Sequence, residues 1–241
     1  VPMASGGAPA AVLHSRIKVA SDRTDFMGHF PESNRHQYMY HRPATEAPEM
    51  KMKTYNVGYL IGSLASESIN RKLATALFKL APEQLKFKEI PFVDLPLYSY
   101  DYDADYPEAG RRFKKAIESS DAILIVTPEY NRSIPGALKN AIDWASRPWG
   151  QNSFNHIPAA VIGASPGQLG TALAQQSMRG VLSFCNARQM TAPEAYINFK
   201  YGLINDKGEI ADASTAKFLR SYLEAFHVFV ARVLTVLPRD A

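Results

Sequence analysis

The sequence predicts an α/β fold in which five parallel strands form a doubly wound sheet with helices on both faces. From Thr54 onward, short apolar runs of strand length alternate with segments whose apolar residues recur at helical spacing. Such alternation is typical of a parallel sheet, because consecutive parallel strands need a crossover helix between them. One run, 121–126, is almost entirely apolar, as expected for a strand that is buried on both of its faces.

The first half of the domain is expected to contain three strands and two helices. The strands are predicted over 55–63, 85–90 and 121–126, and a charged helix over 109–120 precedes the third of them. A helix over 67–81 follows the first strand, and its apolar residues share one face: Ile69, Leu73, Leu77 and Leu80.

The second half is expected to contain two strands and three helices. Helices are predicted over 136–146 and 167–185, on either side of a strand over 158–165, and a fifth strand over 187–192 follows. The last helix, over 212–234, has an apolar inner face made of Phe218, Tyr222, Leu223, Phe226, Phe229, Val230 and Val233.

Residues 1–53 differ from the single domain predicted over 54–241. They contain four of the six histidines and five of the seven methionines, but Leu and Ile occur there only once each. Such a stretch can bury little apolar surface. We interpret it as an N-terminal extension, either a non-native leader or a disordered segment, with the natural start near Met50 or Met52.

Charge, cysteine content and hydropathy limit the partners of this protein. The net charge is +4, and residues 54–241 are close to neutral, so no basic stripe suggests a nucleic acid. Cys185 is the single cysteine, which excludes an intramolecular disulfide and a multi-cysteine metal site, and its apolar neighbours favour core packing. No apolar run approaches the roughly 20 residues that cross a bilayer. We therefore expect a soluble cytoplasmic protein with no metal, membrane or nucleic-acid partner.

The loop after the first predicted strand, 62–70, has the composition of an anion site. Two hydroxyls and an amide, from Ser63, Ser68 and Asn70, surround the start of a helix. Partial positive charge at a helix N-terminus can hold a phosphate. The loop lacks the Gly-Lys-Ser/Thr of a P-loop and the Gly-x-Gly-x-x-Gly of a dinucleotide fold. A Ser-capped helix without a ligand is the alternative.

The loop after the third predicted strand is rich in residues that interrupt regular structure. Pro128 ends the strand, and Glu129, Tyr130 and Asn131 follow it directly. Backbone donors and acceptors in this loop could bind the edge of a planar heterocycle. An ordinary turn is the alternative.

The loop after the fourth predicted strand, 164–172, contains two glycines. Gly167 and Gly170 permit close backbone approach, and the next helix again directs its positive end toward the same edge. Ligands of open α/β sheets bind beyond the carboxyl ends of the strands, where the strand order reverses. We therefore expect the three loops to form one binding edge.

Three segments resemble the NAD(P)H-dependent FMN reductase family, and most closely its bacterial chromate and quinone reductases. They are GSL…S.N in the first loop, VTPEYN.S.PG.LKNAIDW.SRP in the second loop and its helix, and the glycine-containing third loop. The resemblance extends from Tyr55 to about Val236. It implies a flavodoxin-like fold, FMN as cofactor, NADPH or NADH as donor, and quinones or metal oxyanions such as chromate as acceptors. It also implies a homodimer, with a homotetramer as a further assembly.

The resemblance also implies which residues contact FMN. In that family the first loop holds the phosphate, the second contacts the isoalloxazine and ribityl parts, and the third borders the pyrimidine edge. The corresponding residues here are Ser63, Ser68, Ile69 and Asn70, then Pro128, Glu129, Tyr130 and Asn131, and finally Ser165, Gly167 and Gln168.

Three positions depart from the family pattern. Many relatives have an arginine after Gly-Ser-Leu, where this chain has Ala65, with Glu67 two positions further on. Loss of that cation, together with a carboxylate facing the site, is expected to weaken phosphate binding by about 1–2 kcal/mol. Arg132 stands where many relatives have a smaller or aromatic residue. We hypothesise that it binds chromate or the nicotinamide phosphates; an exposed or interface ion pair is the alternative.

The flavin carries the redox chemistry in such enzymes, so no catalytic side chain is predicted. We expect a ping-pong cycle in which NAD(P)H reduces the flavin and leaves before the acceptor takes its place. Amides of the third loop and of the helix after it are expected to stabilise negative charge on reduced FMN. The alternatives are a flavodoxin-type electron carrier, which would not consume nicotinamide, and a flavin-free interaction domain.

Overall fold

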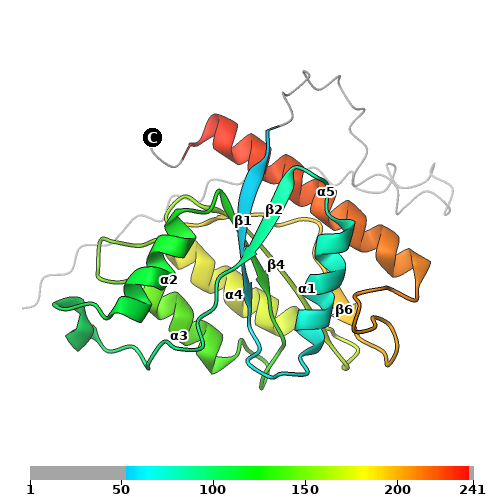
Figure 1. The fold of residues 1–241 in the computed structure, drawn as a ribbon, viewed down its shortest axis with the longest axis horizontal. Helices are drawn as coiled ribbons and strands as arrows, with labels where there is room; N and C mark the ends of the chain where they lie inside the picture. Colours follow the sequence, from blue (N-terminus) through cyan, green and yellow to red (C-terminus); the bar gives the residue numbers. More distant parts are fainter. Residues whose placement is uncertain (1–52, 239–241) are drawn as a thin grey trace, which may run out of the picture. The chain divides into compact units, whose positions relative to one another are not determined.

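The computed structural model describes residues 53–238, so the predicted extension 1–53 lies outside them apart from Lys53. Five parallel strands lie in the order β2-β1-β3-β4-β5, and β6 also pairs with β4 (Figure 1). The order reverses between β1 and β3, the switch point at which open α/β sheets bind ligands. The predicted doubly wound parallel sheet is confirmed. Its strands are β1 (Tyr55–Ile61), β2 (Leu85–Glu89), β3 (Ala122–Val126), β4 (Pro158–Ser165), β5 (Arg188–Gln189) and β6 (Tyr196–Asn198).

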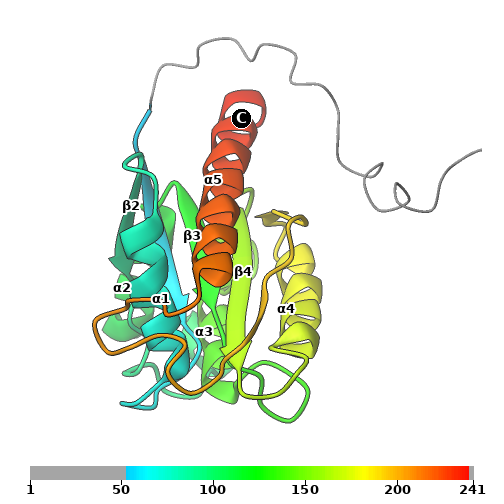
Figure 2. The same cartoon turned by 90° about the vertical axis from the view of Figure 1, so that its right-hand side faces the viewer.

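Helices cover both faces of the sheet, as predicted. α1 (Ile69–Leu80) and α5 (Ala213–Val236) pack side by side on one face, and Figure 2 shows α5 running along the sheet. α2 (Glu108–Glu118), α3 (Gly136–Ala145) and α4 (Ala172–Phe184) cover the other face. In the described part of the chain, no helix is both long enough and apolar enough to cross a membrane.

The central strand β3 is buried on both faces. All five of its residues are fully buried. Leu124 and Val126 belong to the core beneath α1 and α5, whereas Ile123 and Ile125 belong to the core beneath α2, α3 and α4. This division follows from the two-residue period of a strand, and it confirms the prediction for the apolar run 121–126.

The prediction of one fifth strand over 187–192 is wrong in its extent. β5 has two residues and β6 has three, and they pair with the start and the end of β4 respectively. Between them the chain leaves the sheet edge, because Pro193 has no amide hydrogen for a ladder hydrogen bond. Met190 and Ala195 on either side bury their side chains in the core. The second piece, β6, brings Asn198 to the edge where the three loops lie.

The long helix α4 begins at Ala172 and not at Gly167, where the prediction placed it. Gly170 has a φ of +59°, and a Cβ there would lie only 2.7 Å from the carbonyl carbon of Tyr196. A glycine is therefore needed where the third loop passes β6 before the helix starts.

The buried face of α5 differs from the prediction at its first position. Phe218 is 37% exposed, and the buried face instead begins at Leu219, one residue later. The remaining predicted positions are fully or partly buried: Tyr222, Leu223, Phe226, Phe229, Val230 and Val233. Cys185 is buried in the opposite core, as predicted, and burial raises the pKa of its thiol.

Candidate active site

The loops that follow β1, β3 and β4 lie together at the carboxyl edge of the sheet. Backbone hydrogen bonds fix where they start: the Gly62 amide donates to the Val126 carbonyl at 2.8 Å, and the Thr127 amide donates to the Ile162 carbonyl at 2.9 Å. Parallel pairing of the three strands therefore brings these loops to one edge. They span residues 62–68, 127–135 and 166–171.

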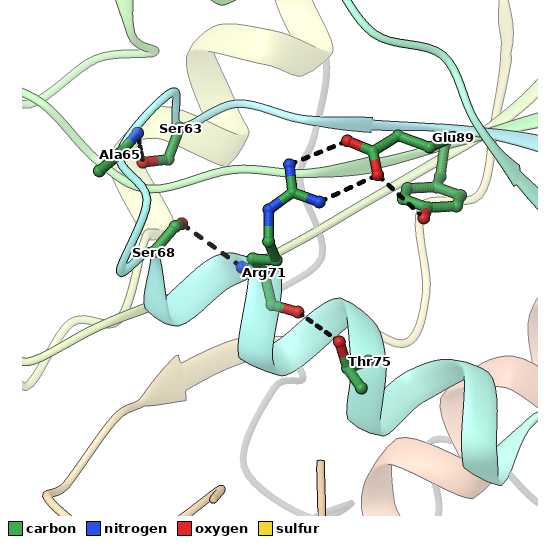
Figure 3. Close-up of polar contacts among 7 residues, drawn as sticks. Ser63, Ala65, Ser68, Arg71, Thr75 and Glu89 are labelled. Carbon is green, nitrogen blue, oxygen red and sulfur yellow. Dashed lines mark hydrogen bonds and ion pairs between the residues drawn. The ribbon is translucent and has the colours of Figure 1, made fainter. Parts of the chain in front are cut away.

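The first loop presents two hydroxyls and the N-terminal amides of α1 (Figure 3). The Oγ of Ser68, the N-cap residue, accepts from the Arg71 amide at 3.4 Å, and the Oγ of Ser63 accepts from the Ala65 amide at 3.3 Å. Both distances exceed the usual range, so these bonds can readily yield to an anion. Two amides in the first turn also have no acceptor within the helix: those of Ile69 and Asn70.

The two basic side chains at the start of α1 are paired with carboxylates. Both terminal nitrogens of Arg71 lie 2.9 Å from oxygens of Glu89, and the Tyr59 hydroxyl donates to the same carboxylate at 3.2 Å (Figure 3). Hydrogen bonds from Arg71 hold the pKa of Glu89 below its ordinary value. Lys72 lies 2.7 Å from Asp206. The first loop therefore offers an anion mainly neutral donors and a helix terminus.

The departures at Ala65 and Glu67 both lie on the exposed part of the first loop. The pKa of Lys72 is raised, first by its hydrogen bond to Asp206 and to a smaller extent by the charge of Glu67.

Asn70 joins the first loop to the end of β4. Its side chain is fully buried; its Nδ2 donates to the Ala164 carbonyl and its Oδ1 accepts from the Ala164 amide, both at 2.9 Å. These two bonds occupy both polar atoms of the Asn70 side chain with the backbone of Ala164. The predicted contact of Asn70 with phosphate would therefore be made by its backbone amide.

The second loop contains a tight hairpin that the sequence analysis did not predict. Tyr130 and Ser133 exchange two backbone hydrogen bonds, at 2.9 and 3.0 Å. The residues between them have positive φ, +50° at Asn131 and +65° at Arg132, as in a type I′ turn. Asparagine is common in such a turn, so Asn131 was the residue from which the turn could have been predicted. Arginine is rare at such a position. The hairpin holds Arg132 in a conformation that an L-residue rarely adopts.

Glu129 directs its carboxylate at the start of α4. Oε2 accepts from the amides of Leu173 at 3.0 Å and Ala174 at 3.1 Å, while Oε1 lies 3.9 Å from the Arg132 guanidinium. The Glu129 side chain is 11% exposed, against 70% for Arg132. The expectation that the α4 terminus stabilises charge on the flavin is wrong for these two amides, because Glu129 already binds them.

The third loop is held from the side by β6. Nδ2 of Asn198 donates to the carbonyls of Pro166 at 3.0 Å and Gly167 at 2.8 Å. Within the loop, the Ser165 hydroxyl donates to the Gly170 carbonyl. Gly167 and the adjacent Gln168 are exposed at the tip. The sequence analysis missed Asn198 because β6 carried no strand signal.

The three loops form an open rim, since each has an exposed apolar side chain: Leu64 is 54% exposed, Tyr130 49% and Leu169 56%. A cavity of about 240 Å³ lies beside the first loop, between Ser63 and Arg71. Larger cavities of about 610 and 580 Å³ lie elsewhere, lined by aromatic residues near α3 and by polar residues at the opposite edge of the sheet. Because size alone carries no chemistry, we assign the site from the donors of the three loops.

The strand order defines a flavodoxin-like α/β fold. The model of the NADPH-dependent FMN reductase family matches residues 55–202. The chain belongs to this family, as its motifs predicted, and membership implies FMN as cofactor and NAD(P)H as electron donor. The neutral donors at the α1 terminus fit the phosphate of FMN.

Several relatives match along nearly their whole length. A 2-hydroxy-1,4-benzoquinone reductase from Burkholderia sp is 46% identical over 72% of this chain and 95% of that protein. A quinone reductase from Pseudomonas putida is 45% identical over 74% of this chain and 96% of its own. The solved structure of FerB, a flavoenzyme NAD(P)H:(acceptor) oxidoreductase from Paracoccus denitrificans, is 46% identical, with a TM-score of 0.72 over 74% of this chain and 98% of that one.

Proposed function

We propose that this protein is an FMN-dependent NAD(P)H:quinone oxidoreductase. The observation that carries the proposal is the meeting of three loops at the sheet's switch point, one of which ends at the hydroxyl-rich N-terminus of α1. Two relatives that share at least 45% of their residues with this chain are named as quinone reductases, which supports the same acceptor class here.

In this proposal the chain binds and orients while FMN, when bound, supplies the redox chemistry. The hydroxyls of Ser63 and Ser68 and the amides of Ile69 and Asn70 would hold the phosphate. The backbone of Pro128, Glu129, Tyr130 and Asn131, with Ser165, Gly167 and Gln168 opposite, would border the ring. Donor and acceptor would use the same open rim in turn, so a ping-pong pattern is expected.

The acceptor range is also part of the proposal. An open rim built largely from backbone groups selects weakly among flat acceptors, so chromate reduction is expected beside quinone reduction. The exposed guanidinium of Arg132 supports binding of anions, although Glu129 lies 3.9 Å from it. Arg132→Ala is expected to raise the KM for chromate or for NADPH, or for both. Unchanged KM values for both compounds would remove Arg132 from the site.

The decisive experiment uses purified protein reconstituted with FMN. NADPH or NADH oxidation is followed with benzoquinone or chromate as acceptor, and parallel initial-rate plots would support the ping-pong order. A flavodoxin-type carrier would bind FMN but not consume the nicotinamide. A protein that shows no flavin absorbance after reconstitution would contradict the proposed function altogether.

We also propose a homodimer that can assemble into a tetramer, in the cytoplasm. Exposed aromatic side chains support association: Trp149 and Phe184 are each 75% exposed, and their ring centroids lie 6.4 Å apart. Light scattering after size-exclusion chromatography is expected to give at least twice the monomer mass, and a monomer at micromolar concentration would contradict the proposal.

A further inference from the structure

We propose that Glu129 is a positioning residue whose carboxylate joins the second loop to the start of α4, directly after the third loop, rather than a residue that binds the flavin through its side chain. The inference rests on the proposed function, because these two loops are those that would border the ring. Its basis is that the two oxygens of one nearly buried carboxylate face different groups: Oε2 accepts from two amides of α4, and Oε1 lies 3.9 Å from the Arg132 guanidinium of its own loop.

The first contact is with the start of α4. Thr171, the N-cap residue of α4, makes no side-chain cap bond, and its hydroxyl instead accepts from Gln175. Glu129, 44 positions before Leu173, takes over that role by accepting from the Leu173 and Ala174 amides. A carboxylate at a helix N-terminus is favoured both by charge-assisted hydrogen bonds and by the helix dipole.

The second contact is with the hairpin that Glu129 precedes. Oε1 faces the guanidinium of Arg132, which has a φ of +65° at the tip of the turn. The hairpin is closed by the two backbone bonds between Tyr130 and Ser133, so these residues are expected to move as a unit. Because its carboxylate is bound to α4, Glu129 can therefore fix the position of the Tyr130–Ser133 hairpin relative to the other two loops.

A positioning role and a purely structural cap make different predictions. A cap contributes stability, and its loss lowers Tm without changing ligand affinity in the protein that remains folded. A residue that positions the hairpin changes the affinity for FMN and the KM values, even where stability is retained. Glu129→Gln separates the two, because its amide oxygen can still accept from Leu173 and Ala174 while its charge is lost.

The matched control is Asp212, which caps α5 by accepting from the Thr215 amide at 2.7 Å and belongs to none of the three loops. Asp212→Ala is expected to lower Tm and to leave the Kd of FMN and both KM values unchanged. Glu129→Ala is expected to lower Tm similarly and to raise the Kd of FMN about tenfold, measured by quenching of FMN fluorescence on the apoprotein. Glu129→Gln is expected to keep Tm within about 2 °C and to raise Kd about threefold.

A double-mutant cycle tests whether Glu129 acts through Arg132. If it does, Glu129→Gln raises the KM for NADPH in the wild-type background but adds nothing in the Arg132→Ala background, while kcat stays within about twofold. Wild-type Kd and KM values in a folded Glu129→Gln variant would overturn the inference and leave the proposed function intact. A wild-type protein that does not bind FMN would overturn both, so the two failures are distinguishable.

Discussion

The N-termini of α1 and α4 lie at the same edge of the sheet, yet a carboxylate of the chain binds the amides of only one of them, α4. At α1 the cap is a serine whose bond measures 3.4 Å, and the nearby cations, Arg71 and Lys72, are paired with carboxylates. At α4 the amides of Leu173 and Ala174 are bound by Glu129 at 3.0 and 3.1 Å. The two termini have the same dipole, but a serine hydroxyl caps α1 whereas a carboxylate caps α4.

This difference shows that a helix N-terminus after a parallel strand is not by itself a phosphate site. Its dipole favours any anion, including a carboxylate of the same chain. At α4 the chain supplies that anion, Glu129, which joins the second loop to the helix. At α1 no carboxylate of the described residues accepts from the first-turn backbone amides, so these amides and the nearby hydroxyls are left for a ligand.

The largest effect is expected where α1 is attached to the sheet. Asn70→Ala removes both bonds to Ala164 and leaves a buried amide and carbonyl without partners. Since each orphaned group costs about 1–3 kcal/mol, the free energy of unfolding is expected to fall by about 3 kcal/mol in urea denaturation. The exposed Asn155 is the control, because Asn155→Ala is expected to cost less than about 0.5 kcal/mol. Equal losses would show that Asn70 does not hold α1 in place.

A new cation should sharpen the contrast at the α1 terminus. Ala65→Arg places a guanidinium in the first loop, and charge-assisted contact with a phosphate is expected to lower the Kd of FMN about tenfold, or about 1.4 kcal/mol. Added salt should reduce this gain. Ala104→Arg, the same change at an exposed alanine in the acidic loop before α2, is expected to leave Kd unchanged. Identical behaviour of the two variants would argue against phosphate binding at α1.

A smaller effect is expected in the hairpin beside the α4 terminus. A left-handed backbone conformation costs an L-residue about 1–2 kcal/mol, and glycine removes this strain. Glycine also raises the conformational entropy of the unfolded chain, which offsets part of the gain in stability. Arg132→Gly should therefore raise the free energy of unfolding by roughly 0.5–1 kcal/mol. His156→Gly, with a φ of +60° at the wild-type residue, should show a similar gain without any change in KM. A loss of stability in Arg132→Gly would mean that its ion pair outweighs the strain.

The smallest effect is expected for the ion pair between Arg71 and Glu89, which lies beside the first loop. The pKa of Glu89 is lowered in the folded protein, first by the hydrogen bond from Arg71, so the ionised form is favoured by folding. The stability that the Arg71–Glu89 pair contributes is thus fully present above the ordinary pKa of Glu, and it is lost as the pH falls through the lowered pKa of Glu89. Because both side chains are partly exposed, Glu89→Gln should cost less than about 1 kcal/mol at pH 7. In urea denaturation, that cost should shrink as the pH falls below the ordinary pKa of Glu and through the lowered pKa of Glu89; a pH-independent difference would contradict this explanation.

Local pattern in the chain was sufficient for the order and type of most elements. A strand buried on both faces requires consecutive apolar residues, and an amphipathic helix requires a 3.6-residue period, so both leave a direct mark on the sequence. Prediction failed where the requirement was not local. β6 has three residues and no such period, and α4 starts late because Gly170 must pass the backbone of β6.

The same distinction separates the kinds of residue at the site from their partners. Serines, a proline and glycines in three loops after strands predict a site for a phosphate and a flat ring, because each supplies a known local donor or turn. Which groups remain available depended on contacts across the fold. Asn70 meets Ala164 and Glu129 meets Leu173 only after β1, β3 and β4 pair in register, and that pairing brings together residues whose separation along the chain leaves no periodic signal.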